Sequence, residues 1–418
     1  MRIKELFSQK PEFAEIRGWV YRIRSSGGIV FAVVRDSTGT IQVTVKKEKG
    51  EAFKNASEAL LESSVVIKGR IKVDERAPGG LELESETFEI ISLAEKFPIQ
   101  EDYSEEYLLD IRHTSIRARR YSNIFKIRSA TFNALRDFFN EEGYYETQCP
   151  MIVTSMVEGG SAMFELNYFG KKAYLTQSSQ FYLEALIYSL EQVYTIAPSF
   201  RAEKSRTPRH LTEFWHCEAE AAWVNNEEMM RFEERMVEST IGSVVDSCES
   251  ELIELGRDVD FLKSIKPPFE RLTYKQALRE LGIKEEEEIG ADEEHALTIK
   301  RKKPVFITEF PRKKGFYHRP DPEKPEVLLC HDLLFPEGYG EIIGGGERVW
   351  DKKELIERIK EFNLNEKDYE WYIDLRRYGS VPHSGFGFGI DRFVRWIAKL
   401  NHIRDTIPFP RTINRYYP

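Results

Sequence analysis

The sequence predicts an α+β protein with two domains: a small β-barrel, followed by a larger domain in which helices flank an antiparallel sheet. Residues 13–92 consist of strand patterns with one short helix, whereas residues 116–418 mix long amphipathic helices with strands. A polar linker, residues 94–115, separates the two patterns. At 418 residues the chain exceeds the usual size of one compact core. We therefore place the barrel at residues 1–93 and the larger domain at 116–418.

The composition excludes several classes of protein. The formal net charge is −9, unlike that of a general polyanion binder, so any contact with nucleic acid must be local. No apolar run approaches the length of a membrane span, and the N-terminus lacks a signal-peptide core, so we expect a cytoplasmic protein without membrane contact. The four cysteines form no Cys-x-x-Cys pair, which argues against a zinc knuckle or a disulfide framework.

The first domain has the element order of an OB-fold, a small barrel that often binds single-stranded nucleic acid on its second and third strands. Three strands, a helix and two strands are predicted at residues 14–24, 29–35, 40–46, 51–62, 64–73 and 81–93. Up to Lys49 the chain carries ten cations and five anions, a local charge of about +5, which suits a phosphate backbone. The alternative is a barrel that binds nothing and only spaces domains.

A hairpin pattern with charged residues lies in the middle of the larger domain. Arg201 and Glu203 are two apart, so on a strand they would share one face. A polar loop follows, and a second strand is expected to return with Arg209, His210 and two aromatic residues, one of them Phe214. Arg suits phosphate oxygens, a carboxylate suits the adenine amino group and an aromatic ring suits the base. The alternative is an ordinary antiparallel hairpin with surface ion pairs.

Helices and strands are also expected on either side of this hairpin. A helix at 180–190 should expose Gln180 and Glu184, and Glu158 lies in a glycine-containing loop that could close over a ligand. Residues 256–325 are charge-rich, with an acidic run that we interpret as solvated surface. Other elements are predicted at 116–140, 144–147, 173–177, 192–199, 226–246, 305–310, 316–319, 328–335, 341–348, 352–362 and 385–400.

Three motifs, taken together with the barrel, resemble a known family. They are a long helix and strand ending at Pro150, the segment Phe200-Arg201-x-Glu203 with Arg209-His210-x-x-x-Phe214, and Gly385-x-Gly387-x-Gly389-x-Asp391-Arg392. In this order they resemble motifs 1, 2 and 3 of a class II aminoacyl-tRNA synthetase. The barrel, with Gly18-Trp19-Val20 and Arg35-Asp36-x-x-Gly39-x-x-Gln42, resembles the anticodon-binding domain of the aspartyl, asparaginyl and lysyl subgroup, in an archaeal-like form.

The resemblance implies an ATP site in which positively charged side chains neutralise the phosphates. Arg201 would hold the α-phosphate and, with Arg392, would carry the catalytic charge compensation. Glu203 would accept from the adenine amino group, Phe214 would stack on the ring, and Arg392 would cover its other face. Arg209 and His210 would reach the γ-phosphate. Glu341, assisted by Asp332, would bind Mg²⁺.

For the amino acid, the resemblance favours asparagine over aspartate. Aspartyl members have Gln-Ser-Pro-Gln-x-x-Lys, whereas this chain has Leu183 at the Lys position, followed by Glu184. A carboxylate there would accept from an amide and disfavour a second carboxylate. Arg348 would donate to the amide oxygen, and Gln180, Glu158 and Glu218 would hold the α-amino end. The chain departs from the family at Gly346-Glu347, where Ser-Gln is usual.

The resemblance therefore implies a two-step reaction: asparagine and ATP form asparaginyl-adenylate, which then reacts with the 3′ end of tRNA(Asn). Phe31 would stack on the middle anticodon base, with Arg24 and Gln42 reading base edges. A homodimer is expected from the first motif. The alternatives are an aspartate–tRNA ligase, including one that charges both tRNAs, a tRNA-independent asparagine synthetase on the same fold, and an RNA-binding protein with an inactive catalytic domain.

Overall fold

The computed structural model describes residues 1–99, 103–154, 163–204, 207–284 and 288–418. Its contacts divide the chain into two compact units, the barrel unit (Met1–Leu109) and the larger unit (Asp110–Pro418). The stretch that we predicted as a polar linker contains two short helices, α3 (Glu105–Asp110) and α4 (Arg112–Ser115). In the part of the chain that the structure describes, no helix has the length and apolar character required to cross a membrane.

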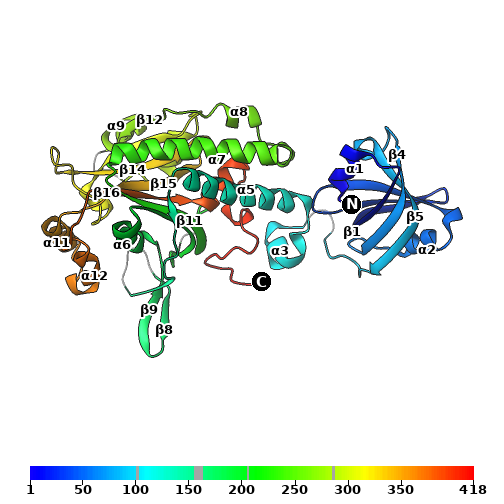
Figure 1. Ribbon diagram of the computed structural model, residues 1–418, viewed down its shortest axis with the longest axis horizontal. Coiled ribbons are helices and arrows are strands. Elements are labelled where there is room, and N and C mark those ends of the chain that lie inside the picture. Colours follow the sequence, from blue (N-terminus) through cyan, green and yellow to red (C-terminus); the bar gives the residue numbers. More distant parts are fainter. Residues whose placement is uncertain (100–102, 155–162, 205–206, 285–287) are drawn as a thin grey trace. The chain divides into compact units, whose positions relative to one another are not determined.

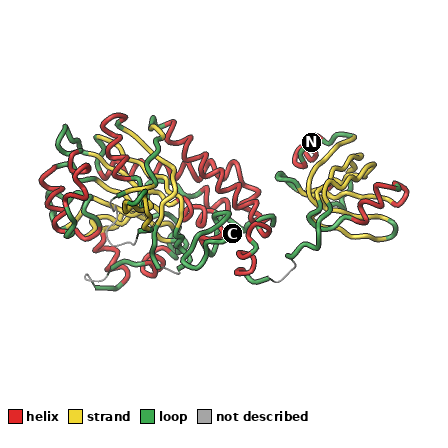
Figure 2. The backbone as a smooth tube through the Cα atoms, turned by 90° about the horizontal axis from the view of Figure 1, so that it is seen from below, coloured by secondary structure: helices red, strands yellow, loops and turns green. Residues whose placement is uncertain are grey.

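The barrel unit is a closed five-stranded barrel in the order β1-β2-β3-β5-β4, which confirms the predicted OB-fold (Figure 2). Alternating residues such as Val30, Ala32 and Val34 are fully buried, because successive side chains of a strand point to opposite faces. The sequence did not reveal a short N-terminal helix whose Ile3 and Leu6 join the barrel core. The elements are α1 (Ile3–Gln9), β1 (Phe13–Ser26), β2 (Ile29–Arg35), β3 (Thr40–Lys46), α2 (Glu51–Glu58), β4 (Ser64–Val73) and β5 (Leu81–Ser92).

The larger unit is built on an eight-stranded sheet in the order β12-β13-β14-β15-β16-β11-β10-β6. Among the described strands of this sheet, only the terminal pairs, β12–β13 and β6–β10, are parallel. Its strands are β6 (Tyr145–Glu146), β10 (Gln192–Phe200), β11 (Glu213–Ala222), β12 (Glu270–Thr273), β13 (Val305–Pro311), β14 (Val327–Phe335), β15 (Gly340–Glu347) and β16 (His383–Gly389). A separate small sheet contains β7 (Ile152–Val153), β8 (Glu165–Tyr168) and β9 (Lys171–Leu175).

Two long helices, α5 (Arg119–Glu141) and α7 (Asn226–Glu254), lie side by side over one face of this sheet (Figure 1). The aromatic core between them and the sheet includes Phe139, which stacks on Tyr194 with ring centroids 4.3 Å apart. Alternate residues of β11 face this core, so the intervening residues are presented on the opposite face, where the functional site lies. The other helices are α6 (Gln180–Leu190), α8 (Val259–Lys263), α9 (Tyr274–Leu281), α10 (Ala291–Thr298), α11 (Lys352–Glu361), α12 (Glu370–Asp374) and α13 (Ile390–Ile397).

Several local predictions were wrong. Helix α6 has the predicted bounds but buries Gln180 and Glu184, which are 8% and 0% exposed, because α12 and β16 pack over that face. Residues 316–319 form a turn with an isolated bridge at His318 instead of a strand. The charge-rich stretch 256–325 folds into α8, β12, α9, α10 and β13 and has a hydrophobic cluster of its own. Residues 285–287 of the acidic run lie outside the described residues.

A buried ion pair joins α5 to the start of α13. Asp391, 1% exposed, pairs with Arg128 and also accepts from the backbone nitrogen of Trp215 at 2.7 Å. We expect Asp391→Ala to lower the free energy of unfolding by about 3–5 kcal/mol, because the Arg128 guanidinium would lose its carboxylate inside the protein. Urea unfolding followed by tryptophan fluorescence measures this. Glu249→Ala, which breaks a solvent-exposed pair with Lys263, is the control and should cause no measurable change. Equal effects of both substitutions would contradict the expectation.

Candidate active site

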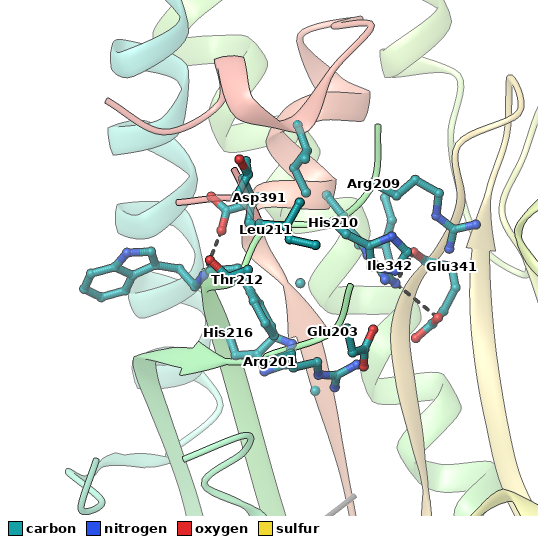
Figure 3. Close-up of a pocket in the computed structure, with 18 residues that line it drawn as sticks. Arg201, Glu203, Arg209, His210, Leu211, Thr212, His216, Glu341, Ile342 and Asp391 are labelled. Carbon is teal, nitrogen blue, oxygen red and sulfur yellow. Dashed lines mark hydrogen bonds and ion pairs between the residues drawn. The ribbon is translucent and has the colours of Figure 1, made fainter. Parts of the chain in front are cut away.

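Two adjoining pockets open on the face of the sheet opposite α5 and α7, and they share Arg201, His216, Glu341 and Gly387. The first pocket lies between the β10–β11 loop, β15 and α13, and Figure 3 shows its lining residues. The second pocket lies over β11, β15 and β16 and is lined by Ser178, Gln180, Arg201, His216, Glu218, Glu220, Lys314, Tyr317, His318, Asp332, Glu341, Gly344, Gly345, Arg348, Phe386 and Gly387.

A loop supplies several of the charged residues that line the first pocket. Strand β10 ends at Phe200, which pairs with Glu213 at the start of β11. Arg201, Glu203, Arg209 and His210 therefore lie in the connecting loop, and the prediction that strands carry them was wrong. All four still line the pocket, with Phe214 on β11. The loop conformation brings the Arg201 guanidinium to 5.5 Å from the centre of the Phe214 ring, which itself meets His216 edge-on.

Positive charge gathers around this pocket. Arg209 pairs with Glu294 at 2.7 Å, and Arg392 donates to the Glu341 carboxylate at 3.1 Å. Burial lowers the pKa of His210 to about 4, and the nearby guanidinium groups, first that of Arg392, add to this effect. His210 is thus neutral at physiological pH, and the arginines supply the positive charge. Such a surface suits a polyphosphate.

A buried acid–base pair forms one wall of the second pocket. Arg348 donates to Glu220 Oε1 from Nε at 3.0 Å and from Nη2 at 2.6 Å, and its Nε also reaches Oε2 at 3.3 Å. Burial would lower the pKa of Arg348, but Glu220 outweighs this and raises it. Gly385 makes the arrangement possible, because a Cβ atom there would lie 2.1 Å from the Glu220 carboxyl carbon. Close beside it, Glu218 accepts from the Ser178 hydroxyl and from the Ser179 backbone nitrogen at 2.8 Å.

Two carboxylates meet where the pockets join. Asp332 and Glu341 flank Gly344: a Cβ atom at that glycine would lie 3.1 Å from Asp332 Oδ1 and 3.5 Å from Glu341 Oε1. Burial raises the pKa of Asp332 to about 6, although its ion pair with Lys314 opposes the shift. Burial also acts to raise the pKa of Glu341, but Arg392 and Lys314 outweigh it and lower that pKa to about 2.

These two carboxylates fit a magnesium ion that takes its other ligands from water and phosphate. Among the described residues, no group of three or more His, Cys, Asp and Glu side chains is placed to hold a metal ion alone. Mg²⁺ binds commonly through one or two carboxylates together with substrate phosphates, so a two-carboxylate set next to a cationic pocket is consistent with such a site.

The structure brings most of the predicted site residues together. Glu341, Arg392 and the loop residues line the first pocket, while Gln180, Glu218, Asp332 and Arg348 line the second. Two residues do not line the second pocket. Leu183 is fully buried in an apolar cluster with Ile187 and Val193, and Glu184 is sealed behind Gln180. We expected both side chains to contact the ligand, and this was wrong because the two side chains of α6 point away from the pocket. Glu158 lies outside the described residues.

Glu220, Lys314 and His216 also line the second pocket, although none of them was predicted as a site residue. Glu220 could have been found, because it lies two residues beyond Glu218 and must share its face of β11. Lys314 follows β13 in a short 3-10 turn, and no sequence pattern marks it.

At Gly346-Glu347, where the chain departs from the family pattern, Glu347 is ion-paired with Arg319 at 2.5 Å. A Cβ atom at Gly346 would lie 2.6 Å from that of Cys330, so this site has no room for a side chain.

In the barrel unit, two of the predicted residues are neighbours. Arg24 pairs with Phe31 across β1 and β2, and its guanidinium lies 4.9 Å from the ring centre. Gln42, on the adjacent strand β3, donates to Glu82 at 3.1 Å. Arg24 is exposed, and Phe31 and Gln42 are half-buried on the outer barrel surface, where a base could reach the ring.

Known proteins match this chain over nearly its full length. Residues 104–413 match the family "tRNA synthetases class II (D, K and N)", and residues 14–91 match the family "OB-fold nucleic acid binding domain". The asparagine–tRNA ligase of Thermoplasma acidophilum is 52% identical over 411 residues, 96% of each chain. That of Thermococcus gammatolerans is 47% identical, with 98% of each chain covered.

Solved structures agree with these relatives. Asparaginyl-tRNA synthetase from Pyrococcus horikoshii, complexed with asparaginyl-adenylate, superposes with a TM-score of 0.97 at 45% identity, covering 100% of this chain and 99% of the other. The Entamoeba histolytica asparaginyl-tRNA synthetase reaches 0.90 at 32% identity, covering 97% of each chain. The family match over residues 104–413 and the relatives that match over nearly the whole length show that the chain belongs to the class II tRNA synthetases of the D, K and N group.

Proposed function

We infer that the chain is an asparagine–tRNA ligase, which activates L-asparagine with ATP and transfers the asparaginyl group to the 3′ end of tRNA(Asn). One observation carries this conclusion. A cationic pocket suited to ATP adjoins, through Arg201, a pocket whose wall is the paired Glu220 and Arg348, complementary to an uncharged amide. The likeness to full-length asparagine–tRNA ligases supports it.

Activation requires positioning and charge compensation more than proton transfer. The carboxylate of the amino acid attacks the α-phosphorus of ATP, and the bond to pyrophosphate breaks. Arg201, shared by both pockets, is placed to neutralise the α-phosphate as charge builds. Glu203 would accept from the adenine amino group, and the Phe214 ring would stack on the base. Arg209, neutral His210 and Arg392 would bind the departing phosphates.

Magnesium would be held by Glu341 and Asp332. When bound, it would neutralise part of the phosphate charge. The pairing of Asp332 with Lys314 shows how the protein compensates this carboxylate with its own cation. Glu341 is ionised because of Arg392 and Lys314, so it can act as a hard oxygen ligand.

The pair Glu220–Arg348 is placed to distinguish asparagine from aspartate. Arg348 would donate to the amide oxygen, and Glu220 would accept from the amide nitrogen, so each polar atom of the side chain has a partner. An aspartate carboxylate would lie against Glu220 in a buried site, which is costly. Glu218 and Gln180 line the same pocket and would hold the α-ammonium group.

The barrel unit would bind the anticodon, with a base on Phe31 and with Arg24 and Gln42 at base edges. A homodimer would use α5 and β6 with the chain that follows them. Tyr145 and Ile152 in that region are 58% and 44% exposed, although both are large and apolar. Such residues at the surface are typical of an interface between subunits. A cytoplasmic location stays a prediction.

The function is tested by ATP–pyrophosphate exchange with each amino acid. We expect kcat/KM for asparagine to exceed that for aspartate by about 10⁴-fold, the discrimination reached when a site hydrogen-bonds a polar substrate group. Charging of tRNA(Asn) in the same preparation completes the assay. A preference for aspartate would identify an aspartate–tRNA ligase. Free asparagine made from aspartate, ATP and ammonia without tRNA charging would identify the asparagine synthetase.

Glu220→Gln should relax the specificity. The variant loses the acceptor for the amide nitrogen and the charge that opposes aspartate, so the asparagine-to-aspartate ratio of kcat/KM should fall by about 10–100-fold. The KM for ATP should not change. The control is Glu233→Gln, an equally buried carboxylate that pairs with His331 outside both pockets. An unchanged ratio in Glu220→Gln would show that another group reads the side chain.

Phe31→Ala should weaken tRNA binding without affecting activation. Loss of one stacked base costs about 1–3 kcal/mol, so KM for tRNA should rise by about 10–100-fold. ATP–pyrophosphate exchange should stay at the wild-type rate, because the barrel unit holds neither pocket. Phe13→Ala, at a 51% exposed position on the same barrel, is the control. If the two substitutions weaken tRNA binding equally, Phe31 is not a specific stacking platform.

A further inference from the structure

A fully buried network lies behind the second pocket and centres on Glu184. This carboxylate accepts from the Tyr372 hydroxyl at 2.8 Å, from Arg376 Nη2 at 2.5 Å and from His383 Nε2 at 2.9 Å. It also accepts from the side-chain amide of Gln180 at 3.0 Å. The side chains of Glu184, Arg376 and His383 are 0% exposed, so none of them can reach a ligand directly.

The network is nevertheless attached to two residues that line the pocket, Gln180 and Arg348. Gln180, at the start of α6, lines the pocket itself. Arg376 donates to the carbonyl of Val349, the residue after Arg348, at 3.0 Å. The carbonyl of His383 accepts from the backbone nitrogen of Arg348 at 2.9 Å. A change at Glu184 is therefore transmitted to pocket residues through hydrogen bonds and not through solvent.

The polarity of the network determines how Gln180 is oriented. An ionised carboxylate can only accept hydrogen bonds, so each of its partners must donate. Burial would raise the pKa of Glu184, but Arg376 and His383 outweigh it and hold the pKa well below its usual value. Gln180 must then turn its NH₂ group toward Glu184. The other end of that amide, Oε1, is left as the acceptor on the side of the pocket.

We propose that Glu184 is a positioning residue for the amino-acid substrate: it fixes the amide of Gln180 so that Oε1 accepts from the substrate's α-ammonium group. This inference rests on the proposed function, because the ammonium group belongs to the amino acid bound in the second pocket. It assigns to Glu184 a role different from direct recognition of the side-chain amide.

Glu184→Gln tests this role, because it replaces the acceptor that faces Gln180 with a donor. The oxygen of the new amide would turn toward Arg376 and His383, which are the strong donors, and its NH₂ group would face Gln180. The Gln180 amide must then flip and direct its own NH₂ group at the substrate ammonium. We expect KM for asparagine to rise at least about 10-fold, as for a lost hydrogen bond to a charged group. We expect kcat, KM for ATP and the asparagine-to-aspartate ratio to stay within about threefold of wild type.

Two further variants separate this role from a structural one. Gln180→Glu combined with Glu184→Gln places a carboxylate on the pocket side and a donor behind it, so it should restore KM toward the wild-type value. Tyr372→Phe is the matched control, since it removes one donor from Glu184 but leaves the bond to Gln180. Its KM should stay near wild type. If Glu184→Gln does not fold, Glu184→Asp replaces it, because the shorter carboxylate keeps its charge but draws back from Gln180 and should also raise KM.

Three outcomes would overturn the proposal: an unchanged KM in Glu184→Gln, a loss of kcat without a change in KM, or a double variant no better than the single one. A fall in the asparagine-to-aspartate ratio would also contradict the proposal, because it would show that Glu184 acts through Arg348 and not through Gln180. Failure of the proposed function is recognised separately, because wild-type protein would then show no asparagine-dependent exchange.

Discussion

The larger unit depends on the pairing of buried carboxylates with buried arginines. Glu220 is paired with Arg348, Glu184 with Arg376, and Asp391 with Arg128, and all six side chains are almost or completely removed from water. An unpaired charge at any of these positions would be strongly destabilising. Each pair also joins segments that are distant in sequence: β11 with the residue after β15, α6 with the chain after α12, and α5 with α13.

The same pairs explain how one sheet supports two neighbouring pockets of opposite character. Arginines from the loop and from α13 face the first pocket, where negative charge must be bound. Carboxylates on alternate positions of β11 face the second, where an ammonium group and an amide must be bound. Glycines in β16 leave room for those carboxylates, since a Cβ atom at Gly385 would collide with Glu220. In the proposed function, specificity would depend on the order of charges along β11 and on the residues that neutralise them.

The identity of the loop residues was predictable, but their geometry was not. Arg201, Glu203, Arg209, His210 and Phe214 were placed at an ATP site because residues of these types recur with fixed spacing, and all of them line one pocket. The strand assignment of the first four failed because a two-residue spacing is compatible with a strand as well as with an extended loop. The predicted side-chain directions of Leu183 and Glu184 were wrong for a related reason. Helical periodicity shows which residues share a face, but not which neighbouring element covers that face.

The sequence by itself determined the class of fold, the barrel with its strand bounds, and the family, because these depend on local periodicity and on motifs of fixed spacing. Only the tertiary structure decided that Glu184 does not reach the second pocket. Glu220 lines it, whereas Glu184 is buried behind Gln180 by Tyr372, Arg376 and His383, which lie about 190 residues away along the chain. Contacts between residues so far apart have no local signature, since they depend on how α6, α12 and β16 pack together.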